Sequence, residues 1–171
     1  YLDKDYYLSD FYDERQSWGF YSDIKNLELI LENINGEKQK INFILTARNW
    51  TCPSLYIAES ISKHTTKNVW FYSFDKIRDG VKSKEMGAYH GAELPYIFNT
   101  HDDWLPTSSR DIYITKKIQD YWINFISFGN PNSDAIKWNK YRSNKSNILS
   151  FNSEISMKTS EAVEVCNELN Y

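Results

Sequence analysis

The three histidines of this chain, His64, His90 and His101, are the side chains best suited to acid–base or metal chemistry. No two of them stand at the spacing of a metal-binding pair with a third ligand, and no His-Glu-x-x-His occurs. His101 is followed by Asp102 and Asp103, but exposed acidic loops are far commoner than metal sites. His64 lies at the end of a predicted helix, where a histidine complements the helix dipole. We therefore predict neither a metal nor a cofactor.

His90 stands in a different setting, because it follows an apolar strand through a loop and is flanked by Gly87 and Gly91. Functional groups cluster on loops at the C-terminal ends of sheet strands. A histidine at such a place can act as a general base if a nucleophile reaches it. Taken by itself, however, this pattern fits a surface histidine more often than a catalytic one.

A nucleophile to partner His90 is missing from these residues. The sequence contains no Gly-x-Ser-x-Gly elbow, no glycine-rich phosphate loop and no Cys-x-x-Cys. The residues alone therefore offer one candidate base without a group for it to activate.

Helical patterns dominate the first part of the chain. Apolar residues at helical spacing predict a helix over residues 23–33, which the Asn-Gly pair at 35–36 ends. The apolar run 41–45 fits either a strand or the start of the next helix. Thr51 is predicted to cap a further helix, with Pro53 in its first turn, where a missing N–H costs little.

Val69–Phe74 is the strongest strand pattern, nearly continuous in apolar and aromatic residues, as in a strand covered on both faces. The polar stretch 75–87 is predicted to be the loop that leads to His90. One strand cannot satisfy its own edges, so it needs a sheet that this sequence does not obviously supply. This indicates a segment of a larger α/β fold.

A long helix is predicted next, begun by a capping box of Ser108 and Asp111 and ended by Gly129, with Pro131 blocking its continuation. Its apolar face comprises Ile114, Ile118, Tyr121, Trp122 and Phe125. A short strand, Ile148 to Phe151, follows. The chain ends in an amphipathic stretch containing Ala162, Val163 and Cys166.

Composition and charge exclude several classes of partner. The chain has 171 residues, 41% of them apolar, and a net charge of -3, so neither nucleic acid nor an anionic membrane is expected. No stretch approaches the roughly 18 apolar residues of a membrane span. Aromatic residues make up 16%, and we interpret them as core rather than as stacking surfaces. Because the first residue is Tyr1, we expect a truncated or processed chain.

The run from Gly87 to Phe98 resembles the catalytic-histidine segment of type-B carboxylesterases and cholinesterases: a histidine, a small residue, an acid three positions on and an aromatic turn. Residues 121–132 with 138–141 are similar to that family's helix and its Gly-x-Pro-Asn stop. Residues 50–53, leading to the strand at 69–74, supply a third match in the same order. The resemblance covers about residues 41–171, and residues 1–40 are placed by position only.

This resemblance implies the C-terminal part of an α/β-hydrolase fold: the last sheet strand, the catalytic-histidine loop and the C-terminal helices. Residues 1–171 would then be a single partial domain of a carboxylic ester hydrolase. The family uses a Ser, Glu or Asp, and His triad, of which only His90 carries over. The serine and oxyanion glycines would precede Tyr1, and none of the acidic residues Asp3, Asp5 and Asp10 has the glycine-rich surroundings of the family's acid.

Composition alone leaves Cys52 and Cys166 as either one disulfide or two inert thiols. The resemblance implies that they pair. It also places Ala47 and Ala162 where many family members carry an ion pair, so we expect two buried alanines near each other. Glu93 is expected to point inward and accept hydrogen bonds, because a buried carboxylate without partners is costly.

Further expectations follow from the resemblance. The substrate would be a small-molecule or lipid ester and the location secreted or extracellular, which glycosylation patterns at Asn49 and Asn144 support weakly. The oligomeric state is left open. Two alternatives stand beside the hydrolase: a non-catalytic adhesion relative of the same fold, and a small binding protein or gene remnant.

Overall fold

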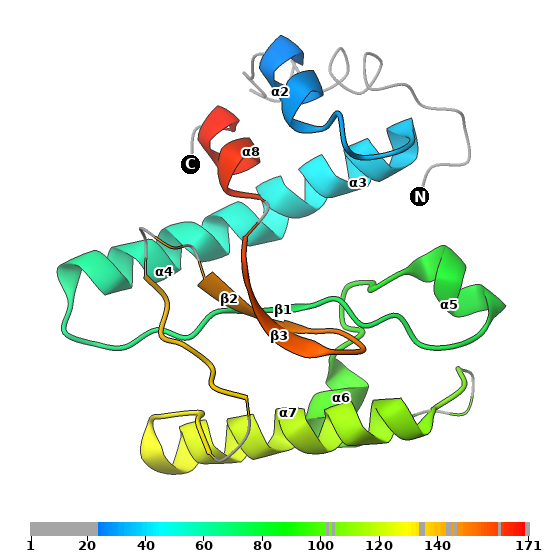
Figure 1. The fold of residues 1–171 in the computed structure, drawn as a ribbon, viewed down its shortest axis with the longest axis vertical. Helices are drawn as coiled ribbons and strands as arrows, with labels where there is room; N and C mark the ends of the chain where they lie inside the picture. The colour runs from blue at the N-terminus through cyan, green and yellow to red at the C-terminus, as the bar shows by residue number, and fades with distance from the viewer. Residues whose placement is uncertain are drawn as a thin grey trace. The chain divides into compact units, whose positions relative to one another are not determined.

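The computed structural model describes residues 24–101, 103, 105–133, 136–142, 145, 147–160 and 162–169. The chain divides into two compact units. We call residues 1–67 with 160–171 the helical unit and residues 68–159 the sheet unit. Figure 1 shows the elements of both.

The helical unit contains α2 (Ile24–Ile30), α3 (Glu37–Thr46), η1 (Ala47–Thr51), α4 (Cys52–His64) and α8 (Val163–Glu168). Figure 1 shows α3, η1 and α4 as one continuous helix, in which η1 is a π-helical turn. The buried apolar side chains of this unit are Leu31, Ile41, Ile44, Ala47, Leu55, Ala58, Ala162 and Val165.

Of the two alternatives for the run 41–45, the helix is confirmed, because the run lies within α3. One sequence prediction for this unit needs correction. Thr51 does not cap a new helix: its backbone has φ -71° and ψ -48°, and its side chain makes no cap hydrogen bond. The N–H of Cys52 instead bonds the carbonyl of Ala47 through the π turn, so there is no free helix start to cap.

Cys52 and Cys166 form the predicted disulfide within the helical unit, with Cα atoms 5.4 Å apart. Both cysteines are buried. Ala47 and Ala162 are also buried, with 1% and 6% of their surfaces exposed, as expected at these two positions. Their proximity to each other stays a prediction.

The sheet unit is built on three strands, β1 (Tyr72–Phe74), β2 (Asn147–Phe151) and β3 (Ile155–Thr159), in the order β1-β2-β3. β1 is parallel to β2, and β2 is antiparallel to β3. The predicted strand Val69–Phe74 is therefore confirmed in its second half only. β3 was not predicted, although the alternation of Ile155, Ser156, Met157 and Lys158 is typical of a strand with one buried face.

The helix α7 (Ser109–Phe128) lies along one face of the sheet, with α6 (Leu94–Phe98) beside it (Figure 1). Trp138 lies in the core between α7 and the sheet. Its ring centroid is 5.5 Å from that of Tyr121 and 5.9 Å from that of Phe151. The core also includes Tyr96, Ile114, Ile118, Leu149 and Ile155. Both of these Trp138 pairs are edge-to-face, an arrangement that ring quadrupoles prefer, which supports the interpretation of the aromatics as core.

Both ends of α7 agree with the sequence analysis. Ser108 and Asp111 form a reciprocal capping box, and Gly129 ends the helix with φ 65°. The predicted apolar face is correct at Ile114, Ile118 and Tyr121, whereas Phe125 remains 49% exposed. The predicted loop 75–87 is wrong in part, because it contains the short helix α5 (Val81–Met86).

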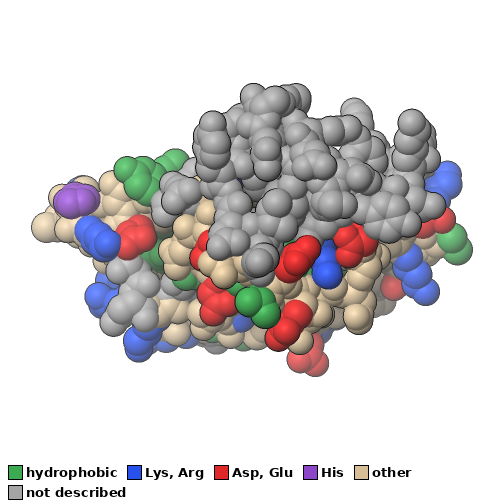
Figure 2. Space-filling model, turned by 90° about the horizontal axis from the view of Figure 1, so that it is seen from above, with side chains coloured by type: hydrophobic (Ala, Val, Ile, Leu, Met, Phe, Trp, Pro, Cys, Tyr) green, Lys and Arg blue, Asp and Glu red, His purple; other side chains and the backbone are tan. Residues whose placement is uncertain are grey.

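On the face shown in Figure 2, basic and acidic side chains lie among one another rather than in patches of one sign. Among the described residues, no helix is both long and apolar enough to cross a membrane.

Candidate active site

His90 lies on an exposed turn between α5 and α6, after the C-terminal end of β1, as predicted. The turn is held by its own backbone: the N–H of Ala92 bonds the carbonyl of Tyr89 at 2.9 Å, and the N–H of Leu94 bonds that of Gly91 at 3.1 Å. The imidazole is thus presented to solvent by an ordered backbone.

The backbone conformation at Gly91 explains why the residue after the histidine is a glycine. Its φ is +87°, in the region that side chains disfavour, although a Cβ there would meet only Leu94 Cδ1 at an ordinary 3.6 Å. The constraint is therefore backbone conformation rather than space. Any other residue would strain the turn that carries His90.

The helix α6 follows this turn directly and is fixed by Tyr96, which is fully buried. The ring of Tyr96 packs on Phe74 at 4.9 Å and on His101 at 4.9 Å between centroids. Its hydroxyl donates a 2.7 Å hydrogen bond to Asp111 Oδ1. Tyr96 lies in the segment that resembles the family's histidine motif, and no separate role was predicted for it.

Asp111 is fully buried, and polar groups from three segments contact its carboxylate. Its Oδ2 accepts from the backbone N–H of Ser108 at 2.8 Å and from the Ser108 hydroxyl at 2.6 Å. Its Oδ1 accepts from Tyr96 and lies 3.3 Å from the ammonium of Lys76, which is 3% exposed. The carboxylate therefore joins the segment after β1, α6 and the start of α7.

These contacts set the ionisation of the buried groups. Burial alone would raise the pKa of Asp111, but hydrogen bonds from Ser108 and Tyr96 and the charge of Lys76 outweigh it and hold that pKa below its usual value. Burial, followed by the bond to Asp111, raises the pKa of the Tyr96 hydroxyl. Asp111 is thus a stable anion that accepts a hydrogen bond from Tyr96 and forms an ion pair with Lys76.

Glu93 differs from its prediction. Its side chain is half-buried and forms no cap hydrogen bond with α6, although it is that helix's N-cap residue. The prediction that it accepts hydrogen bonds is wrong among the described residues, because water still reaches this carboxylate and no polar group must compensate for burial. Burial, and then the negative charge of Glu93, raise the pKa of Tyr72, so the two side chains are near each other.

The positions of the other two histidines are explained by the fold. His64 is exposed in the last turn of α4, at the helix end that favours a positive charge. His101 Nε2 lies 2.7 Å from Thr115 Oγ1, beside the Tyr96 ring. Asp102 lies outside the described residues, and no cluster of metal ligands occurs among those described.

The sheet unit has two hollows that are lined by residues other than the histidines. An apolar one of about 210 Å³ is lined by Trp70, Tyr72, Tyr121, Trp122, Phe125, Pro131 and Trp138. A polar one of about 580 Å³ lies over the segment after α7 and is lined by Asn130, Asn132, Lys137, Trp138, Asn139, Lys140, Arg142, Lys145 and Asn147. His90 is in neither lining.

Sequence reasoning missed Lys76 and the connection of Tyr96 to Asp111. The one available signal was a lysine two residues after an apolar strand, in a stretch otherwise predicted to be a polar loop. An exposed imidazole on such a supported turn can accept a proton from a neighbouring hydroxyl.

The sequence matches the carboxylesterase family over residues 26–168. It is 30% identical over 95 residues to para-nitrobenzyl esterase of Bacillus subtilis (strain 168), which is 53% of this chain and 19% of that protein. It is 24% identical over 141 residues to acetylcholinesterase of Bungarus fasciatus, covering 79% of this chain and 23% of that protein. Neuroligin-3 of Mus musculus is 23% identical over 122 residues, which is 68% of this chain and 15% of that protein.

Solved structures agree in fold. A PNB esterase superposes with a TM-score of 0.70 at 22% identity, over 99% of this chain and 34% of the other. A thermophilic PNB esterase gives 0.69 at 21% identity, over 99% and 35%. The chain thus spans about a quarter or less of the curated relatives it matches, and its fold is the C-terminal part of an α/β hydrolase. The family match covers most of the sequence, and the chain belongs to the carboxylesterase family.

Proposed function

We propose that residues 1–171 form the C-terminal segment of one type-B carboxylesterase domain, and that this domain hydrolyses carboxylic esters with His90 as its general base. The observation that carries the proposal is the place of His90: an exposed imidazole on a hydrogen-bonded turn beyond β1, inside the segment that matches the family. The serine nucleophile and the triad acid come from residues outside this chain.

In the first step, His90 takes the proton of the serine hydroxyl while the serine oxygen attacks the ester carbonyl carbon. A tetrahedral oxyanion forms, stabilised by backbone N–H groups outside these residues. His90 then returns the proton to the departing alkoxide, so an alcohol leaves and an acyl-serine remains.

In the second step, His90 takes a proton from water as the water oxygen attacks the acyl-serine carbonyl. The tetrahedral species collapses to a carboxylic acid, and His90 returns the proton to the serine oxygen. The imidazole ends each cycle neutral, so the reaction consumes one ester and one water and needs no cofactor.

The substrate class is a small-molecule or lipid ester, and the net charge of -3 does not favour a nucleic acid. Secretion is supported by the disulfide, which persists in oxidising compartments. Asn49 is exposed and accessible to glycosylation, whereas Asn144 lies outside the described residues.

The test uses the full-length protein encoded by the complete gene. It should contain a Gly-x-Ser-x-Gly elbow, hydrolyse p-nitrophenyl esters, and be labelled by a fluorophosphonate at one serine. A full-length protein that has no such serine and leaves the esters intact would rule out the hydrolase.

A non-catalytic binding protein is the second candidate. The observation in its favour is the exposed apolar surface at the end of α7, formed by Ile123, Phe125, Ile126 and Phe128. Such a protein would keep the fold but show neither labelling nor hydrolysis, so the same experiment separates the two candidates.

A further inference from the structure

We propose that Tyr96 is a positioning residue for His90, acting through the hydrogen bond of its hydroxyl to the buried carboxylate of Asp111. This inference rests on the proposed function of His90. It concerns how firmly the imidazole is held, and it assigns no direct contact of Tyr96 with substrate.

The connection from His90 to Tyr96 is short and hydrogen-bonded. The turn closes between Gly91 and Leu94 at 3.1 Å, and the N–H of Tyr96 bonds the carbonyl of Glu93 at 3.0 Å. Any displacement of α6 is therefore transmitted to the histidine turn.

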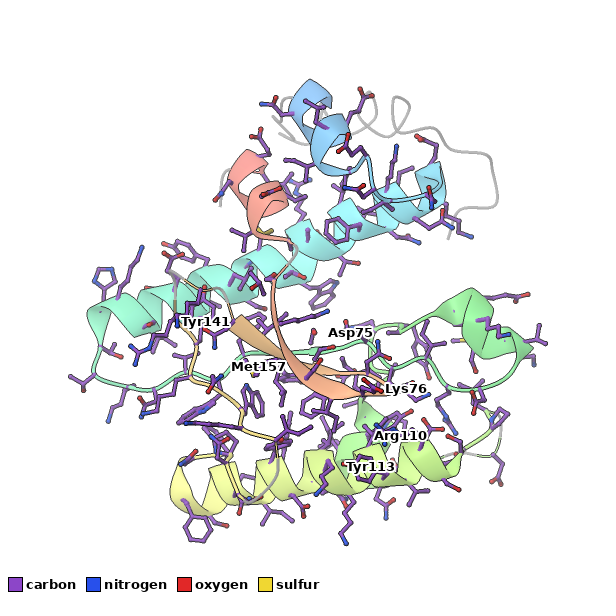
Figure 3. The ribbon with its side chains drawn as sticks, viewed as in Figure 1. Asp75, Lys76, Arg110, Tyr113, Tyr141 and Met157 are labelled. Carbon is purple, nitrogen blue, oxygen red and sulfur yellow. A yellow bond between two sulfur atoms is a disulfide. The ribbon has the colours of Figure 1, made fainter. Side chains whose placement is uncertain are left out.

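The far end of this connection is the Asp111 carboxylate, which is fixed independently of α6. Two donors from Ser108 hold Oδ2 at 2.6 Å and 2.8 Å, within the capping box of α7. Lys76 follows Asp75 just after the end of β1 (Figure 3). Its ammonium lies 3.3 Å from Asp111 Oδ1. The Tyr96 hydroxyl is the only one of these donors that belongs to α6.

The Tyr96→Phe substitution separates this anchor from packing. The ring contacts with Phe74 and His101 would remain, while the hydroxyl bond to Asp111 would be lost. Asp111 would keep Ser108 and Lys76, so the fold should survive and α6 alone should loosen. A misplacement of about 1 Å can lower a rate on the order of 100-fold.

Tyr121→Phe is the matched control. Tyr121 is also almost fully buried, at 2% exposed, and packs against Trp138 in the same core. Its hydroxyl donates to the carbonyl of Ile136 at 2.5 Å, away from the histidine turn. Both variants lose a buried hydroxyl, but only one loses the connection to His90.

Both variants are made in the full-length protein and compared by kcat and KM per titrated active site, and by the NMR line widths of the His90 ring. Tyr96→Phe should lower kcat on the order of 10- to 100-fold with KM within about 2-fold, and broaden the His90 resonances by exchange. Tyr121→Phe should leave both readouts unchanged.

The proposal is overturned if both variants keep the kcat and the His90 line widths of the wild type. A lowered melting temperature in both would then be the only effect of losing either hydroxyl. The NMR readout does not depend on turnover. If the wild type hydrolyses no ester, the proposed function fails, whereas broadening of His90 in Tyr96→Phe alone still supports the anchor and its absence still rejects it.

Discussion

The helical unit and the sheet unit are stabilised by different means. In the helical unit a covalent bond, Cys52–Cys166, joins two segments separated by 114 residues, around a small aliphatic core. In the sheet unit the described residues contain no disulfide, and an aromatic core is combined with the buried Asp111, Lys76 and Tyr96. The disulfide joins two segments at one point. The hydrogen bonds and ion pair of the polar cluster, in contrast, orient several side chains relative to one another.

This difference coincides with the place of the proposed general base. His64 in the helical unit is an exposed helix-end residue, whereas His90 in the sheet unit is on a turn connected to the polar cluster. Directional support is what a general base needs, because proton transfer depends on the angle and distance of the imidazole. The predictions below test this division of roles.

The largest expected effect is that of His90→Ala in the full-length protein. Because a triad acts as a unit, kcat should fall by a factor on the order of 10⁴–10⁶. His64→Ala should leave kcat unchanged, since that residue only complements a helix end. Hydrolysis of p-nitrophenyl esters measures both, and the 171-residue chain made alone should not exceed background.

Either of two results would contradict this assignment. Full activity in His90→Ala would remove its role as base, and activity of the isolated chain would reveal a nucleophile within these residues. Near-ultraviolet circular dichroism of the variants would exclude misfolding as the cause of a loss.

The second effect is the loss of the disulfide. Opening a loop of 114 residues removes an entropic constraint estimated at about 4–5 kcal/mol in the free energy of unfolding. Urea denaturation of Cys52→Ser/Cys166→Ser, against the wild type with and without reductant, measures it. Reductant should shift the wild type to the midpoint of the double variant and leave the variant itself unaffected; equal midpoints throughout would mean that the bond constrains nothing.

The third effect compares two aspartates of the sheet unit. Asp111→Asn should cost about 3–5 kcal/mol, because it leaves the buried ammonium of Lys76 without its counterion. Asp75 accepts from Ser73, Ser150 and Lys158 but is 33% exposed, so Asp75→Asn should cost only about 1 kcal/mol after solvent screening. Chemical denaturation at pH 7 gives both values, and similar costs would show that burial is not decisive.

The same aspartates set a pH dependence. The pKa values of Asp111 and Asp75 are both lowered in the folded protein, against burial, by hydrogen bonds and lysine charges. Their stabilisation is therefore full above the unfolded pKa of about 4 and is lost as pH falls through the lowered folded values. Unfolding free energies from pH 7 to pH 3 should fall less in Asp111→Asn than in the wild type.

The smallest effect compares two predicted caps. Ser108→Ala should cost about 1 kcal/mol, because its hydroxyl caps α7. Thr51→Ala should change the free energy of unfolding by less than about 0.5 kcal/mol, because no helix begins there. Thermal melts of the two variants check the pair, and a cost at Thr51 equal to that at Ser108 would mean that η1 does not continue the helix in solution.

Ser108 and Thr51 also show how much of the fold could be predicted from the sequence. The Ser108 box and the Gly129 stop were predictable because each depends on residues within one turn. Thr51 carried the same local signal, yet its predicted role is wrong because a π turn upstream continues the helix through it. Local patterns indicate where a helix can begin, and the backbone before it decides whether one does.

The disulfide, the family's histidine segment and the fold class were accessible through resemblance. The support of His90 was not, because Lys76, Tyr96 and Asp111 come from three distant segments and each has an ordinary local role. Lys76 follows a strand, Tyr96 lies in an aromatic run and Asp111 completes a cap. Only their burial in one place turns them into a cluster.

The spacing of the two cysteines sets an order of events during synthesis. The whole sheet unit lies between Cys52 and Cys166 in the chain. At a translation speed of roughly 5–20 residues per second, Cys166 is made about 6–23 seconds after Cys52. During that interval the Cys52 thiol is open to other oxidants and thiols, and the sheet unit has time to fold before the disulfide closes the loop that contains it.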